Sequence, residues 1–238
     1  MFFCLILMAI LATLKASVAE EIPLLAIDVG HSRLQPGAIS AYGKSEFEFN
    51  KALAATIRQV IASQGGRVVD IGGDGNELNL FDRTRKAGNA GASFFLSIHH
   101  DSVQPEYLKS WQWRGLKRSY SDHAAGFSLF ISRRNSELAS SLRCASLIGA
   151  ALIQKGLRSS QHHAEKIAGE SKEWADQANG VYFYDNLAVL KTATMPAVLL
   201  EAGVIVNRDE ELRLQKPEMR NSIAAAVEKG LRNCGVLK

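Results

Sequence analysis

The chain has 238 residues, 47% of them hydrophobic, and a formal net charge of +4. This length supports one well-buried domain, and the sequence has no internal repeat of the kind that builds a solenoid. Because the basic residues are scattered and are not interleaved with aromatic residues, the sequence argues against nucleic-acid binding. A weak positive charge instead favours association with an anionic polymer such as a cell wall.

The amino-terminal segment is predicted to be an export signal. An apolar run over residues 2–14 ends in small residues at 17–19, which is typical of a secretory signal cleaved after Ala19. No lysine or arginine precedes the apolar run, so an uncleaved anchor or a buried first helix is the alternative. We therefore expect a signal peptide at residues 1–19 and one domain at residues 20–238.

Two cysteines, Cys144 and Cys234, lie beyond this signal. An oxidising compartment would permit a disulfide, but two cysteines do not make a scaffold, and each lies in a helical pattern. We interpret both as small core residues, which leaves their pairing open.

The first predicted strand leads to a histidine. Residues 24–29 are a short apolar run followed by Gly30 and His31, a pattern typical of a buried strand that ends in a turn.

The next helix is predicted to carry a buried carboxylate. Ser45 and Glu48 have the spacing of a capping box, so the helix should begin at Ser45. Glu46 projects onto the apolar face of this helix, whereas Glu48 points away. A buried carboxylate left unpaired costs several kcal/mol, so Glu46 needs a cationic partner.

A second strand and helix follow. Residues 67–71 favour a strand and 79–91 a helix, with the glycine-rich run 72–75 between them. That run lacks the GxGxxG spacing and the lysine of a phosphate-binding loop, so we interpret it as a turn.

The stretch from Ser93 to Ser102 organises the predicted fold. Its apolar residues predict a buried strand, and the strand ends in His99, His100 and Asp101. Ligands of open α/β sheets bind beyond the carboxyl ends of the strands, so these side chains should reach a binding crevice.

Two long polar stretches lie between the predicted elements, at residues 103–125 and 159–179. Residues 103–125 show no clear periodicity and could form a lid or substrate wall beside His99, or an ordinary surface excursion. Residues 159–179 contain His162 and His163, for which we expect no chemical role because adjacent histidines in a solvated segment rarely have one.

The remaining elements complete an alternating pattern. Residues 126–132 favour a strand, a helix capped by Ser136 should run to Lys155, and 181–190 suit a strand or hairpin. Residues 197–200 form another apolar strand that ends in Glu201. The tail from Asp209 should be helical, with Pro217 at a helix start.

The predicted fold is therefore α/β, a single domain with helices on both faces of a mixed, mostly parallel sheet.

These elements bring together a candidate metal site. Zinc hydrolases commonly use three protein ligands from histidine and carboxylate, leaving a fourth position for water, and His31, Glu46 and His99 supply that set. Zinc lowers the pKa of a coordinated water from 15.7 to about 7. Glu201 is then placed to accept the proton of the water and return it to the leaving amine.

Several readings of this site stay open. A single histidine after a strand is often a hydrogen-bonded structural residue, and Glu201 could simply cap a turn. His100 competes with His99 as a ligand, and Asp101 could be the acceptor that orients a ligating imidazole.

Four motifs resemble one known family in order and spacing. They are IDVGH at 27–31, the pattern of Gly43, Glu46 and Asn50, SIHHDS at 97–102 and PAVLLEAGVIVN at 196–207. Together they resemble the zinc-dependent N-acetylmuramoyl-L-alanine amidases that split daughter cell walls.

The resemblance implies a peptidoglycan hydrolase with one zinc ion per chain. It would cut the amide between N-acetylmuramic acid and the L-alanine of the stem peptide, with His31, Glu46 and His99 as metal ligands and Glu201 as the catalytic carboxylate. It also implies a sheet of about six strands, a monomer exported to the periplasm, and for some relatives a helix across the zinc that a protein activator removes. The stretches 103–125 and 159–179 are candidates for such a helix here.

The chain departs from the family pattern away from these four residues. An Arg-Asp element is replaced by the run 72–75, an Ala-Asn pair reads Ala87-Gly88, and a Gly-Phe pair reads Gly203-Val204. These changes bear on substrate detail more than on the chemistry. The alternatives are a zinc peptidase of related fold and a non-catalytic wall-binding regulator.

Overall fold

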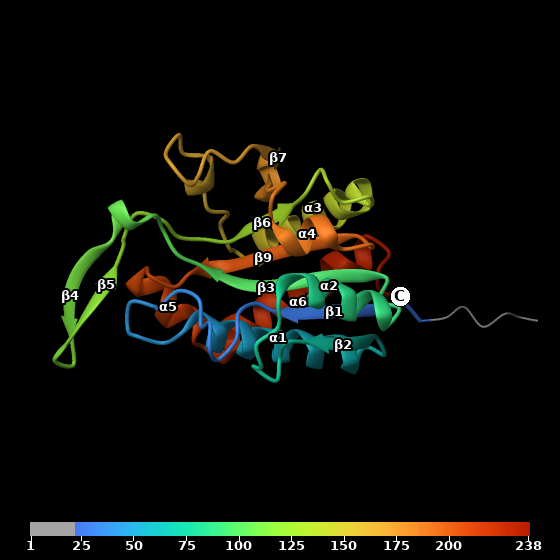
Figure 1. Ribbon diagram of the computed structural model, residues 1–238, viewed down its shortest axis with the longest axis horizontal. Coiled ribbons are helices and arrows are strands. Elements are labelled where there is room, and N and C mark those ends of the chain that lie inside the picture. Colours follow the sequence, from blue (N-terminus) through green and yellow to red (C-terminus); the bar gives the residue numbers. More distant parts are fainter. Residues whose placement is uncertain (1–21) are drawn as a thin grey trace, which may run out of the picture.

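The computed structural model describes residues 22–238 (Figure 1). The predicted signal at 1–19 lies outside the described residues. Within residues 22–238, no helix has both the length and the apolar character needed to cross a bilayer.

A seven-stranded sheet lies at the centre of the molecule (Figure 1). In spatial order its strands are β2 (Arg67–Ile71), β1 (Leu24–Val29), β3 (Phe94–Asp101), β9 (Ala197–Val204), β6 (Ser128–Ile131), β8 (Val181–Phe183) and β7 (Trp174–Asp176). The first four run parallel, β6 is antiparallel to β9, β8 is parallel to β6, and β7 is antiparallel to β8. The mixed, mostly parallel α/β sheet is confirmed, and β7 adds an edge strand from the polar stretch 159–179.

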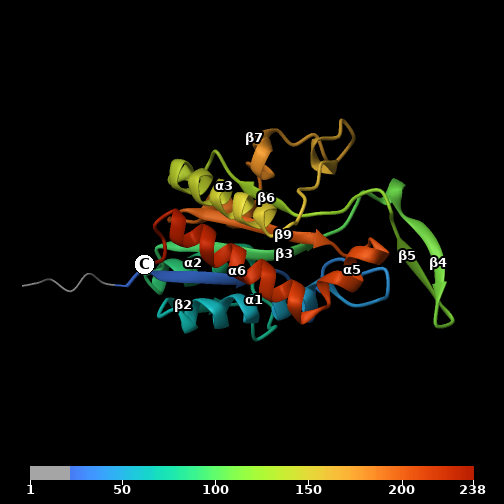
Figure 2. The same ribbon diagram turned by 180° about the vertical axis from the view of Figure 1, so that it is seen from behind.

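Helices cover both faces of this sheet (Figures 1 and 2). One face packs against α1 (Glu46–Ser63), α3 (Leu138–Gln154) and α6 (Pro217–Asn233), and the other against α2 (Leu80–Asn89) and α4 (Ala188–Thr192). The short helix α5 (Arg208–Leu214) follows β9. Pro217 begins α6, as the sequence predicts.

The central strands are apolar on both sides because helices lie on both faces. Successive residues of β1 point in opposite directions, so Leu25 and Ile27 join the core under α1 and α6, while Ala26 joins the core under α2 and α4. Because β1, β3 and β9 are parallel neighbours, their carboxyl ends meet at one edge of the sheet. This edge carries the predicted site residues.

The start of α3 corrects the prediction that Ser136 is a helix cap. The helix begins at Leu138 after Glu137, with no side-chain cap. The Oδ1 atom of buried Asn135 instead accepts a hydrogen bond from the Glu137 amide, and its Nδ2 donates to three carbonyls of the segment before β9. Asn135 therefore joins the helix start to a neighbouring segment, which the cap pattern could not reveal.

Residues 181–190 do not form a single strand or hairpin. The strand β8 covers only Val181–Phe183, and a tight turn, in which the Leu187 amide donates to the Tyr184 carbonyl over 3.2 Å, leads into α4. A short apolar run is ambiguous between strand and helix, and here it contains both.

The stretch 103–125 contains a β-hairpin rather than only loop. Strands β4 (Lys109–Trp113) and β5 (Leu116–Tyr120) pair antiparallel around Arg114 and Gly115, both with positive φ, as a two-residue hairpin turn requires. The hairpin projects beyond the main sheet (Figure 1). The hairpin is joined to the segment before α1 by a hydrogen bond that Trp111 Nε1 donates to the Ala41 carbonyl over 3.1 Å.

Cys144 and Cys234 form a disulfide that joins α3 to the end of α6. Their separation of 90 residues closes a long loop. Both cysteines are buried, as interpreted from the sequence, and the pairing that the sequence left open is a disulfide. Helical periodicity placed each on a packed face but could not show that the two faces meet.

Replacing both cysteines with serine should lower the free energy of unfolding by about 2–5 kcal/mol, because the unfolded chain regains the freedom of a long loop. Urea unfolding of the variant and of the wild type measures the difference. Dithiothreitol should destabilise the wild type similarly and leave the variant unchanged. Equal midpoints for all four samples would contradict the disulfide.

Candidate metal centre

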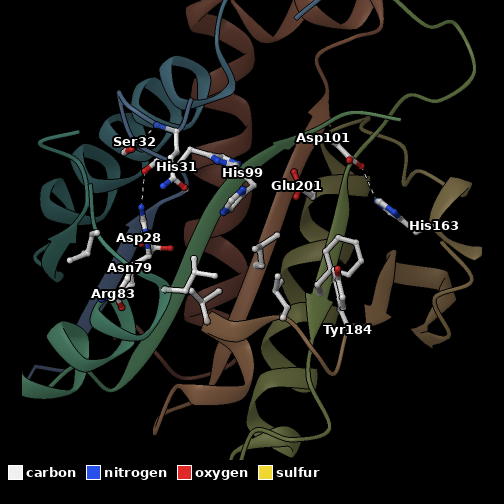
Figure 3. Close-up of a pocket in the computed structure, with 18 of the residues that line it drawn as sticks. Asp28, His31, Ser32, Asn79, Arg83, His99, Asp101, His163, Tyr184 and Glu201 are labelled. Atoms are coloured by element: carbon white, nitrogen blue, oxygen red, sulfur yellow. Dashed lines mark hydrogen bonds and ion pairs between the residues drawn. The ribbon is translucent and has the colours of Figure 1, made fainter. Parts of the chain in front are cut away.

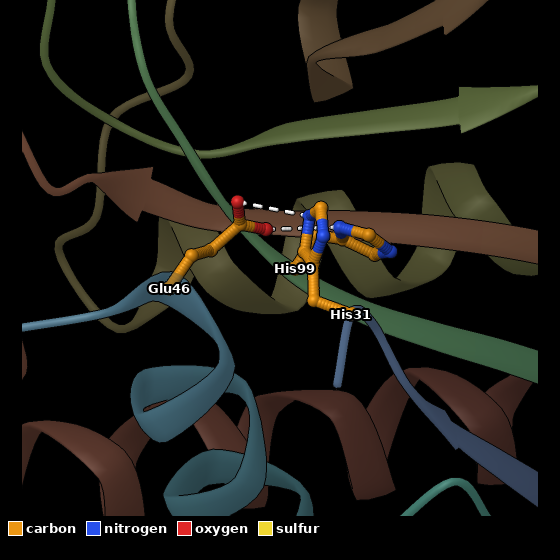
Figure 4. A group of neighbouring side chains, drawn as sticks. All are labelled: His31, Glu46 and His99. Atoms are coloured by element: carbon orange, nitrogen blue, oxygen red, sulfur yellow. Dashed lines mark hydrogen bonds and ion pairs between the residues drawn. The ribbon is translucent and has the colours of Figure 1, made fainter. Parts of the chain in front are cut away.

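Two imidazoles and one carboxylate converge at the carboxyl edge of the sheet (Figure 4). His31 Nε2 lies 3.0 Å from Glu46 Oε2, and His99 Nδ1 lies 3.0 Å from Glu46 Oε1. One donor atom from each of the three residues falls within 4.8 Å of the others, so the group could hold a metal ion. The geometry agrees with the ligand set predicted from the sequence.

Two glycines make room for this group. A Cβ atom on Gly30 would lie 2.2 Å from His99 Nε2, and one on Gly37 would lie 2.4 Å from Glu46 Oε2. Both contacts are far below van der Waals separation. His31 itself has a φ of 69°, an uncommon conformation for a residue with a side chain and one often found at functional sites.

Glu46 is held as a carboxylate by its surroundings. Glu46 is the first residue of α1, and its side chain is buried. The carboxylate accepts hydrogen bonds from the Ala38 amide at 3.1 Å and from Asn50 Nδ2 at 3.2 Å. Burial alone would raise the pKa of Glu46, but hydrogen bonds and charge interactions with His31 and His99 outweigh it and hold the pKa well below its usual value. An ionised carboxylate between two imidazoles is a suitable ligand for a divalent cation.

The predicted capping box is present at this helix start. Ser45 Oγ accepts from the Glu48 amide, and the Glu48 carboxylate accepts from the Ser45 amide. This pairing occupies Glu48 and leaves Glu46 to face the sheet.

Glu201 lies beside the same group, in a cavity of about 660 Å³ that also contains His31 and His99 (Figure 3). Glu201 on β9 is the register partner of His99 on β3. Its Oε2 atom is buried and has no hydrogen-bond partner, and burial, followed by the charges of Asp101 and Glu46, raises the pKa of Glu201 well above its usual value. A buried carboxyl group with a raised pKa in a cavity is typical of a proton-transfer residue.

His100 is not part of this group. It points to the opposite side of β3, where it is buried and its Nδ1 lies 2.8 Å from Asn50 Oδ1. Burial lowers the pKa of His100 to about 3, so it is a neutral structural residue. His99 is therefore the histidine of this pair that faces Glu46.

The expectations for Asp101, His162 and His163 need correction. Asp101 contacts His162 and His163 rather than a histidine of the first group. Both histidines are buried, not solvated. Burial opposes protonation of His163, but the Asp101 and Glu170 carboxylates raise its pKa to about 9. The sequence pattern suggested a surface segment because Asp101, the partner that the two histidines share, lies about 60 residues away.

The two long polar stretches differ in their relation to the cavity. His163, Glu170 and Lys172 from the stretch 159–179 line one wall of the cavity, whereas none of the hairpin residues 109–120 does. Neither stretch contains an α-helix. The hairpin is thus a surface excursion, whereas Gln104 of the same stretch 103–125 and the stretch 159–179 line the cavity wall.

The comparisons with known proteins identify the family. The sequence pattern of the N-acetylmuramoyl-L-alanine amidases matches residues 25–233. This chain belongs to that family. The amidase is 26% identical over 233 residues to N-acetylmuramoyl-L-alanine amidase AmiA of Escherichia coli, covering 86% of this chain and 73% of the relative.

Solved structures agree with this assignment at the level of fold. An N-acetylmuramoyl-L-alanine amidase of Clostridium difficile 630 superposes with a TM-score of 0.70 at 18% identity, covering 90% of the present amidase and 97% of that chain. The CwlD amidase of Clostridioides difficile, solved in complex with the GerS lipoprotein, superposes with a TM-score of 0.66 at 22% identity. The match covers 89% of the present amidase and 98% of that chain. The predicted α/β architecture is thus that of known amidases.

The amidase also contains a buried support that the sequence reasoning missed. Arg83 on α2 pairs with Asp28 at 2.7 Å and donates to the carbonyls of Val29 at 2.6 Å and His31 at 2.7 Å (Figure 3). Ser97 Oγ donates to the second Asp28 oxygen over 2.6 Å. The sequence did contain a sign of this support, because Asp28 lies inside an apolar strand and a buried aspartate requires a partner.

Arg83→Leu should destabilise the amidase by about 3–5 kcal/mol, because Asp28 would remain buried without its partner. The His31 carbonyl would also lose its donor, so metal should dissociate faster from the variant. Urea unfolding and a chelator competition measure the two effects. Arg85→Leu is the matched control on the same helix: Arg85 is 67% exposed, so its loss should change stability by less than about 1 kcal/mol.

Proposed function

We propose that this amidase hydrolyses the amide between N-acetylmuramic acid and the L-alanine of the peptidoglycan stem, with a zinc ion held by His31, Glu46 and His99. The observation that supports the proposal best is the convergence of one donor atom from each of these three residues within 4.8 Å, next to Glu201, whose buried Oε2 atom has no hydrogen-bond partner. The family membership of residues 25–233 supports the substrate.

The donor set fits zinc. Two imidazole nitrogens and a carboxylate are a common ligand set of catalytic zinc sites, which keep one position open toward a cavity. When bound there, zinc supplies a Lewis acid that polarises a carbonyl oxygen and lowers the pKa of a water molecule. The cavity beside His31 and His99 can admit both substrate and water.

Glu201 is proposed to move the proton. Its raised pKa favours proton uptake from the attacking water, and the resulting carboxylic acid can protonate the departing alanine nitrogen. The unpartnered Oε2 atom is free for this exchange because no protein donor competes for it. Asn50 and the Ala38 amide meanwhile hold Glu46 in place.

We further propose that the amidase acts as an exported monomer in the bacterial envelope, where peptidoglycan lies. The amino-terminal sequence 1–19 supports export. A protein activator remains a proposal, and the GerS complex of the CwlD relative supports it by showing that a neighbouring fold accepts a protein partner.

Digestion of purified cell walls tests this function. The products should be intact stem peptides with a free L-alanine amino terminus, identified by mass spectrometry, and a chelator should abolish their release until zinc is restored. Shortened stem peptides would indicate a peptidase instead. Zinc-loaded protein that binds walls but releases no peptide, even with candidate activators, would indicate a wall-binding protein.

A further inference from the structure

A second group of potential metal ligands lies outside the first. Asp101 from β3 faces His162 and His163, which form the short 3-10 helix η2 (His162–Ala164). The distance to Asp101 Oδ2 is 3.3 Å from His162 Nε2 and 2.8 Å from His163 Nε2. The donor atoms of the three residues all fall within 4.8 Å of one another. Two imidazoles and a carboxylate are again the donor types that zinc prefers.

The outer nitrogens of both imidazoles are already held. His162 Nδ1 lies 2.7 Å from Ser160 Oγ, and His163 Nδ1 lies 2.8 Å from Glu170 Oε2. Gln104 Nε2 in turn donates to the other Glu170 oxygen over 2.8 Å. Metal-binding histidines usually have such a partner on the nitrogen that faces away from the ion, because it fixes the ring orientation and tautomer. Both Nε2 atoms are thereby directed at one point.

One of these two Nε2 atoms lacks a hydrogen-bond partner. His162 is 4% exposed, and its buried Nε2 makes no hydrogen bond despite its proximity to Asp101. The Asp101 Oδ2 atom already contacts His163, and Asp101 Oδ1 accepts from the Ser102 amide. A buried polar atom without a partner is costly, and an ion placed between the three side chains would satisfy it.

We propose that Asp101, His162 and His163 form a second site for a divalent transition-metal ion, with zinc as its preferred occupant. The site is separate from the group of His31, Glu46 and His99 and does not rest on the proposed function. Glu170 and Ser160 orient its histidines without binding the ion.

The position of this site gives it a structural role. Asp101 and His163 line the same cavity as His99 and Glu201, and Figure 3 shows Glu201 between His99 and Asp101. The ion would connect β3 to the stretch 159–179 and so hold one cavity wall against the sheet. Because Asp101 and His163 line the cavity, an ion held there would be within reach of water or of a substrate carboxylate.

Zinc stoichiometry tests the proposal. Protein dialysed against buffered zinc and measured by inductively coupled plasma mass spectrometry should contain about two zinc ions per chain in the wild type and about one in His31→Ala. His163→Gln should also retain about one, and the double variant should retain none. His123→Gln is the control, since His123 is a partly exposed histidine of the same region that belongs to neither group, and it should match the wild type.

Failure of either site gives a distinct result. If only the second site exists, the wild type and His31→Ala each hold one ion and His163→Gln holds none. If His31→Ala holds no zinc and His163→Gln holds as much as the wild type, the second site is refuted. Titration of the wild type and of His31→Ala with Co²⁺, followed by visible absorption, is an independent measurement. Saturation at two ions per wild-type chain supports the proposal, and saturation at one in the wild type with none bound by His31→Ala overturns it.

Discussion

Glu201→Gln should lower the rate of amide hydrolysis by about 10²–10⁴-fold, the usual contribution of a general acid and base. Gln occupies a similar volume but cannot accept the proton of the attacking water or return it to the leaving nitrogen. Since Glu201 is not one of the three proposed zinc ligands and its Oε2 atom makes no hydrogen bond to them, zinc content should stay at the wild-type level. Peptide release from cell walls and metal analysis of the same samples measure both quantities. Full activity in the variant would remove Glu201 from the mechanism.

The same substitution should change stability in a pH-dependent way. Burial raises the pKa of Glu201 in the folded metal-free protein above its ordinary value of 4.5, so the folded state binds a proton more tightly than the unfolded state. The stability that Glu201 contributes is therefore fully present below about pH 4.5 and is lost as the pH rises through the folded pKa, whereas Gln does not titrate. The melting temperature of metal-free Glu201→Gln should exceed that of the wild type increasingly as the pH rises.

Gly30→Ala should remove metal from the first group and with it the activity. The added Cβ would lie 2.2 Å from His99 Nε2, and within 2.6 Å of two other ring atoms, so the His99 ring must leave its position beside Glu46. Loss of ligand orientation weakens metal binding by at least about 10–100-fold. A zinc competition titration with a chromophoric chelator measures this loss directly.

Gly88→Ala is the matched control for this change. A Cβ at Gly88 would meet its nearest atom at 3.6 Å, which is an ordinary contact, and the residue lies within a helix. This variant should retain zinc affinity and activity, and alanine favours the helix by up to about 1 kcal/mol. Zinc affinity equal to the wild type in Gly30→Ala would show that His99 is not a ligand.

The first group was predictable because each of its members follows from a local pattern. Apolar runs located the ends of β1 and β3, and helical periodicity placed Glu46 on the buried face of α1. Parallel neighbouring strands end at one edge, so the convergence of His31, Glu46 and His99 follows from topology. The capping box also distinguished the two neighbouring glutamates, because it assigned Glu48 to the helix cap and left Glu46 as the ligand candidate. Their identical charge could not distinguish them.

The second group and its surroundings were not predictable in this way. The environment of His162 and His163 is set by Asp101, which lies about 60 residues earlier, and the segment that carries them has no periodic pattern. The disulfide and the contacts of Asn135 are likewise long-range. Local propensity determines which element forms, but only packing determines which distant side chains meet.

The order of the strands along the chain affects how the cleft can be completed during synthesis. His31, Glu46 and His99 belong to the first 101 residues, whereas β9, which carries Glu201, is the last strand to be made and lies between β3 and β6. A polypeptide that emerges amino end first can therefore gather the three donors long before the proton carrier arrives. If Glu201 carries the proton as proposed, an unfinished chain that lacks β9 should hydrolyse nothing until this late strand enters the middle of the sheet.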